Sequence, residues 1–159
     1  MTQDLKRIKK DRMLYTKDKT SANLIILAIV LDALYFVSIY KQDIGSYYYT
    51  WEIGASIIIN LLFLLSAFLA SEGVKNRKKG YTGILVILGI LQFIRVEQLP
   101  KRAHMATVEG VPVMDDKQYI FVIVCLILSG ICCICAAVIS FINNKTLQEY
   151  VDSLENKSA

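Results

Sequence analysis

Four long apolar runs dominate this chain of 159 residues, and each has about the length needed to cross a lipid bilayer. They are Ala22–Tyr40, Trp51–Ala70, Tyr81–Leu99 and Tyr119–Ile142. A hydrocarbon core of roughly 30 Å takes about 20 helical residues. Lipid offers the backbone no hydrogen-bond partners, so crossing segments must be helices or closed barrels. Because the runs are continuously apolar instead of alternating, they favour helices. The sequence predicts an all-α integral membrane protein, a bundle of four transmembrane helices.

The apolar runs divide the chain into three parts. We expect a basic juxtamembrane segment over residues 1–21, a transmembrane domain over 22–142 and an amphipathic tail over 143–159. The first run is too long for the apolar core of a typical signal peptide, so we interpret it as an uncleaved span with Thr20 or Ser21 as its N-cap. The connecting segments are too short for a soluble catalytic domain, and we therefore expect no enzyme.

The basic residues predict how the chain is oriented. Thirteen Lys and Arg residues precede the first run, lie between the second and third, or follow the fourth, whereas the opposite side carries four. The positive-inside rule then predicts a cell-membrane protein with both termini in the cytoplasm. These residues are expected to contact anionic headgroups of the inner leaflet. No basic face with base-reading residues is visible, so we expect no nucleic-acid partner.

Aromatic residues flank the first outer connection. Tyr40, Tyr47–Tyr49 and Trp51 have the apolar ring and polar tip that suit the headgroup level of a bilayer. We interpret them as an aromatic belt, and a ligand-stacking platform is the alternative.

Polar residues at membrane depth are the strongest candidates for a site, because polar groups in the bilayer are costly. Asp32, Asn60, Gln92 and Arg95 lie within the runs, and Glu52 lies near the outer surface. Helical spacing predicts that they face a common axis. At ~1.5 Å of rise per residue, Arg95 lies at a height between the two carboxylates and can pair with either one. Three interpretations of this cluster are open. It is a buried ion pair that fixes helix register, or a site for a substrate, lipid headgroup or proton, or a pair that another subunit completes.

The fourth run carries small residues at helical spacing. Small residues let membrane helices approach closely. They are predicted to form a helix-packing face, either inside the bundle or against another protein; its members are Cys125, Ser129, Cys132, Cys133, Ala136, Ala137 and Ser140.

Two patterns suggest redox or metal chemistry. The C-x-x-C of Cys132–Cys135 resembles the fourth-helix motif of the vitamin K epoxide reductase family, which implies thiol redox chemistry. That family relays electrons through a second cysteine pair in an external loop, and this chain has none. His104 with Glu109, Asp115 or Asp116 is the only metal pattern, and one histidine without fixed ligand spacing makes it weak. We expect neither a cofactor nor a metal.

An acidic residue in the first span also resembles the membrane-embedded carboxylate of small four-helix multidrug transporters, with Asp32 in that place. The Gln92–Arg95 pair and the 19-residue loop Pro100–Gln118 depart from that pattern. We therefore expect a small accessory or scaffolding subunit that packs against a larger membrane complex, a transporter above all, or against a second copy of itself. The alternatives are a standalone transporter or lipid-headgroup binder that uses Asp32 and Arg95, and a membrane thiol redox enzyme.

Overall fold

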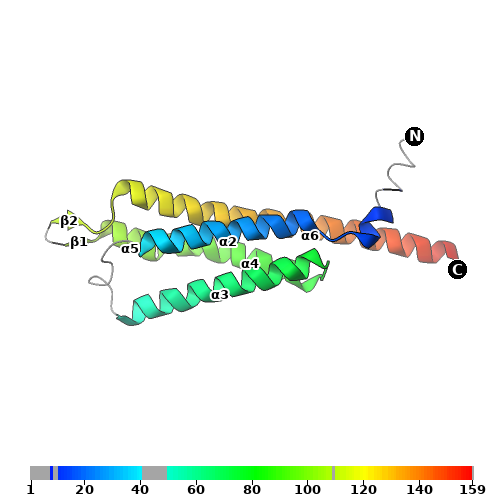
Figure 1. The fold of residues 1–159 in the computed structure, drawn as a ribbon, viewed down its shortest axis with the longest axis horizontal. Coiled ribbons are helices and arrows are strands. Elements are labelled where there is room, and N and C mark those ends of the chain that lie inside the picture. The colour runs from blue at the N-terminus through cyan, green and yellow to red at the C-terminus, as the bar shows by residue number, and fades with distance from the viewer. Residues whose placement is uncertain (1–7, 9–10, 41–49, 109, 159) are drawn as a thin grey trace.

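The computed structural model describes residues 8, 11–40, 50–108 and 110–158, and four long apolar helices form a bundle (Figure 1). These are α2 (Lys19–Ile39), α3 (Thr50–Lys75), α4 (Gly80–Glu97) and α6 (Asp116–Ser158). All four are long and apolar enough to cross a membrane. The prediction of a helical bundle with four candidate spans is confirmed.

The start of α2 corrects one local expectation. The N-cap is Asp18, not Thr20 or Ser21, because the Asp18 carboxylate accepts a hydrogen bond from the Ser21 backbone amide at 3.2 Å. A carboxylate at this position satisfies one of the amides that a helix start leaves without an intrahelical partner.

The connection from α4 to α6 contains more structure than the loop expected over 100–118. A short helix, α5 (Leu99–Met105), follows α4 directly. Two short strands, β1 (Thr107–Val108) and β2 (Val111–Pro112), then pair antiparallel. Gly110 supplies the positive φ of 82° in the turn between them. We call this side of the molecule the hairpin end and the opposite side, where α2 begins, the terminal end.

The last helix runs unbroken from the fourth span into the tail. α6 has 43 residues, and its final part extends past the other three helices at the terminal end (Figure 1). The predicted amphipathic tail over 143–159 is thus, as far as Ser158, a continuation of the same helix. Asn143 and Asn144 do not end it, because neither glycine nor proline follows to break the backbone hydrogen bonding.

The core of the bundle has two apolar parts with a polar layer between them. α6 packs against α2 and α4, and α3 also packs against these two helices. Toward the terminal end, the core includes Ile25, Ala67, Leu85 and Ala136. A second apolar cluster, containing Tyr35, Val122 and Leu126, lies toward the hairpin end. Along α2, α4 and α6 the polar residues described next come between these two clusters.

Candidate functional site

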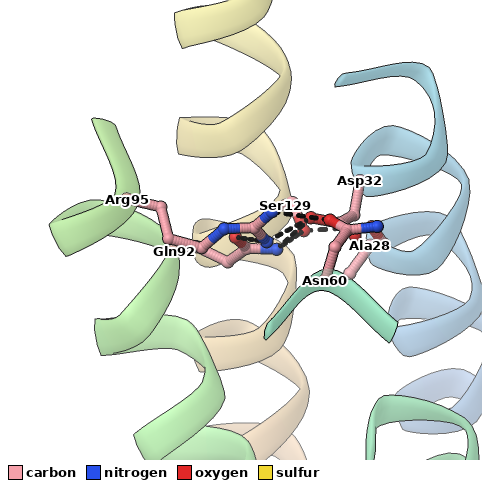
Figure 2. A network of polar contacts seen from close by, with 6 residues as sticks. All are labelled: Ala28, Asp32, Asn60, Gln92, Arg95 and Ser129. Atoms are coloured by element: carbon pink, nitrogen blue, oxygen red, sulfur yellow. Dashed lines mark hydrogen bonds and ion pairs between the residues drawn. The ribbon is translucent and has the colours of Figure 1, made fainter. Parts of the chain in front are cut away.

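Arg95 joins three helices at the centre of the polar layer (Figure 2). Its Nη1 donates to Asp32 Oδ1 of α2 at 2.7 Å, which makes a buried ion pair. Its Nη2 donates to Asn60 Oδ1 of α3 at 2.6 Å. The Asp32 side chain is fully buried and that of Arg95 is 8% exposed. Arg95 therefore links α2, α3 and α4. Hydrogen bonds to charged groups are stronger in a low-dielectric interior than in water, so these contacts stabilise the packing of the three helices.

Gln92, one helical turn before Arg95, extends this network to α6. Its Oε1 accepts from Arg95 Nη1 at 2.9 Å. Its Nε2 donates to Asp32 Oδ1 at 2.8 Å and to Ser129 Oγ at 3.1 Å. Ser129 Oγ in turn donates to the Ala28 carbonyl at 3.0 Å, so every spanning helix contributes a polar group. We call Asp32, Asn60, Gln92, Arg95 and Ser129 the polar network.

Two buried atoms of the polar network remain unsatisfied. Asp32 Oδ2 and Asn60 Nδ2 have no hydrogen-bond partner among the described residues. One is an acceptor and the other a donor. Aromatic rings supply further contacts to the guanidinium: the Tyr35 ring centroid lies 4.8 Å from Arg95 Cζ, and that of Phe63 lies 5.9 Å away.

An open cavity of about 250 Å³ borders Arg95 on the hairpin side. Here the first turns of α3 lie apart from α2 and α4 (Figure 1). Trp51, Ile59 and Leu99 are among its apolar wall residues, and Arg95 and Arg102 are its charged ones. The cavity therefore has an apolar wall and, at its inner end, the Arg95 guanidinium, whose charge is paired with that of Asp32.

The structure thus brings together four of the five predicted polar residues. Asp32, Asn60, Gln92 and Arg95 meet, and Arg95 pairs with Asp32. The side chain of Glu52 lies outside the described residues, as do Tyr47–Tyr49 of the predicted aromatic belt. Ser129 also belongs to the network, although the sequence places it only in the helix-packing face. A serine at small-residue spacing does not indicate that its hydroxyl bonds to another helix.

The predicted helix-packing face of α6 lies inside the bundle. Six of its seven members are buried and Cys132 is partly buried. The closest approach is to α4 at a pair of glycines: a Cβ added at Gly130 would come within 3.1 Å of the Gly89 carbonyl oxygen. Of the two alternatives left open, the small residues serve contact within the chain.

The cysteines and the histidine do not assemble further sites. Cys133 faces the core and Cys135 is exposed on the outer surface of α6. The His104 ring stacks on Tyr119 with centroids 4.1 Å apart, and its Nε2 lies 3.8 Å from Asp116 Oδ1. Among the described residues, no three His, Cys, Asp or Glu side chains are grouped to hold a metal ion. Glu109 lies outside that part of the chain.

Comparison with protein-family models, curated proteins and solved structures finds no match to this chain.

Proposed function

We propose that this protein is a non-enzymatic accessory subunit of the cell membrane, which docks onto a larger membrane complex, with a transporter as the expected partner. The observation that carries the proposal is the part of α6 that extends beyond the bundle (Figure 1). Leu147, Val151 and Leu154 follow one another at helical spacing on the last part of α6. Leu147 and Val151 are partly buried and line a cavity with the turn between α3 and α4, whereas Leu154 is 38% exposed. Such a stripe on a projecting helix is the element that another protein's groove recognises.

The interior of the bundle supports a scaffolding role. The polar network joins all four helices in one register, and a buried charge pair is a device that fixes register. α4 and α6 also pack closely within the chain at Gly89 and Gly130. The four spans therefore make a rigid platform, and the partner binds to surfaces that this packing leaves uncovered.

Affinity purification of the tagged full-length chain from native membranes, followed by mass spectrometry, tests the proposal. A larger membrane protein recovered in stoichiometric amount is the expected result. The double variant Val151→Ser and Leu154→Ser should lose this partner, because it removes the apolar stripe. Glu149→Ser is the matched control, since Glu149 lies on the opposite, charged face of the same helix. Recovery of the chain alone, or as a homo-oligomer, contradicts the accessory role.

The cavity beside Arg95 favours one second candidate, a binder of lipid headgroups. Its apolar wall, with the guanidinium groups of Arg95 and Arg102 beside it, fits an anionic amphiphile. Trp51 lines the cavity and is the only tryptophan of the chain, so its emission reports on the occupant directly. Addition of a short-chain anionic phospholipid should shift the emission, and Ala55→Phe, which fills the cavity, should abolish the shift. An emission unchanged by saturating phospholipid contradicts this candidate.

A further inference from the structure

Three chain segments meet at the terminal end, away from the polar network. The Asp18 carboxylate accepts hydrogen bonds from Ser21 Oγ at 2.9 Å and from Asn143 Nδ2 of α6 at 3.0 Å. The Asp18 backbone amide donates to the Lys75 carbonyl, at the end of α3, at 3.1 Å. These bonds hold the segment before α2 against both the α3–α4 turn and α6.

Arg77 lies in this turn in an uncommon conformation. Its φ is +57°, in the left-handed region that residues other than glycine rarely adopt. Its Nε donates to the Thr16 carbonyl at 3.2 Å. Its Nη1 is buried and has no hydrogen-bond partner among the described residues. An unsatisfied buried donor is costly, and a charged one more so. Arg77 thus combines a left-handed backbone conformation with a buried guanidinium nitrogen that has no acceptor among the described residues.

The cavity beside Arg77 is basic. It has a volume of about 600 Å³ and is open to the outside. Its charged lining residues are Arg12, Lys17, Lys19, Arg77 and Asp18. Asp18 is the single acidic residue among them, and its carboxylate is already engaged by Ser21 and Asn143. Four cationic side chains and one carboxylate therefore line this space. We call this space the terminal cavity.

We propose that the terminal cavity binds a phosphate group, with Arg77 as its inner ligand and Lys17 and Lys19 at its mouth. Arginine suits this role because its planar donors match phosphate oxygens. The cavity adjoins Lys19, the first residue of the α2 span. The phosphate is therefore that of a lipid headgroup at the membrane surface, or free phosphate. This site is independent of the proposed docking function.

Native mass spectrometry of the full-length chain in zwitterionic detergent tests the site. Phosphatidic acid and diacylglycerol with the same acyl chains are compared, because they differ only in the phosphate. The chain should retain phosphatidic acid alone. Arg77→Gln and, separately, Lys17→Gln should each weaken retention by roughly tenfold, the loss expected from one charge-assisted contact. Lys78→Gln is the matched control, since Lys78 is exposed in the same turn and does not line the cavity.

The results separate the possible outcomes. If Lys78→Gln weakens the retention of phosphatidic acid as much as Arg77→Gln does, the attraction is due to the overall positive charge. If diacylglycerol is retained as well as phosphatidic acid, the phosphate group is not recognised. Either result overturns the proposal. Lys17→Gln keeps the test valid if Arg77→Gln does not fold, because Lys17 is exposed. Competition by millimolar inorganic phosphate assigns the site to free phosphate, and its absence assigns the site to the lipid. Both of these last results support a phosphate site.

Discussion

Arg95 is the residue on which the polar core depends, because it bonds to Asp32, Gln92 and Asn60 at once. Asp32→Ala should lower the free energy of unfolding by about 3–5 kcal/mol, since it leaves a buried guanidinium without its counter-charge. Thermal unfolding in detergent, followed by size-exclusion chromatography of the heated samples, measures the loss. A stability within error of the unmodified chain would show that the pair does not hold the bundle together.

A second variant separates the cost of an unpaired charge from the loss of packing. The double change Asp32→Leu and Arg95→Met removes both charges and keeps apolar volume. It should recover part of the stability lost in Asp32→Ala, because no lone charge remains. Recovery will be incomplete, since Gln92 Oε1 and Asn60 Oδ1 lose the hydrogen bonds that Arg95 Nη1 and Nη2 donate to them. A double variant less stable than Asp32→Ala would contradict this explanation.

Depth and helical spacing predicted which polar residues come together, but not how they bond. Asp32, Asn60, Gln92 and Arg95 lie at similar depth, and polar groups in lipid must face protein, so their meeting follows from the sequence. The choice of Asp32 as the partner of Arg95 depends on how the helices are rotated. The same holds for Ser129, whose hydroxyl bonds to the Ala28 carbonyl only because α2 and α6 pack closely.

At the scale of the helices, α4 and α6 pack closely at Gly89 and Gly130. A Cβ added at Gly89 would lie 2.7 Å from Ile134 Cγ1 and 3.2 Å from the Gly130 carbonyl oxygen. Gly89→Ala should therefore lower the thermal unfolding temperature in detergent. Gly83→Ala is the control on the same helix, because nothing lies within 4 Å of its added Cβ. It should be neutral or stabilise the protein by about 0.5–1 kcal/mol through the higher helix propensity of alanine. An equal effect of both changes would rule out close packing as the cause.

Apolar length predicted the four spanning helices, whereas the structure between and after them depends on local chemistry. Hydrophobic periodicity marks where a helix is buried, not where its hydrogen bonding stops. The end of the apolar run at Ile142 is for this reason not the end of the helix, and α6 continues through Asn143 into the polar tail. Likewise, α5 and the hairpin lie in a segment with two prolines and a glycine, Pro100, Gly110 and Pro112, which predict turns without fixing their order.

At the scale of the whole molecule, the two ends differ in charge and in the sites they carry. The terminal end holds the basic terminal cavity and the projecting part of α6. The hairpin end holds the cavity beside Arg95, the short helix α5 and the two strands. The polar network lies between them and joins all four helices.

This asymmetry predicts which end faces the cytoplasm. The terminal end carries most of the Lys and Arg residues, and positively charged loops are retained on the cytoplasmic side. In a background without the native cysteines, Asp115→Cys at the hairpin end should react with a membrane-impermeant maleimide in intact cells. Asn156→Cys, near the end of α6, should react only after the cells are permeabilised. Both positions are exposed, so unequal reactivity reports the side of the membrane and not burial. The reverse labelling pattern would contradict this orientation, because it would place the terminal cavity and the end of α6 outside the cell.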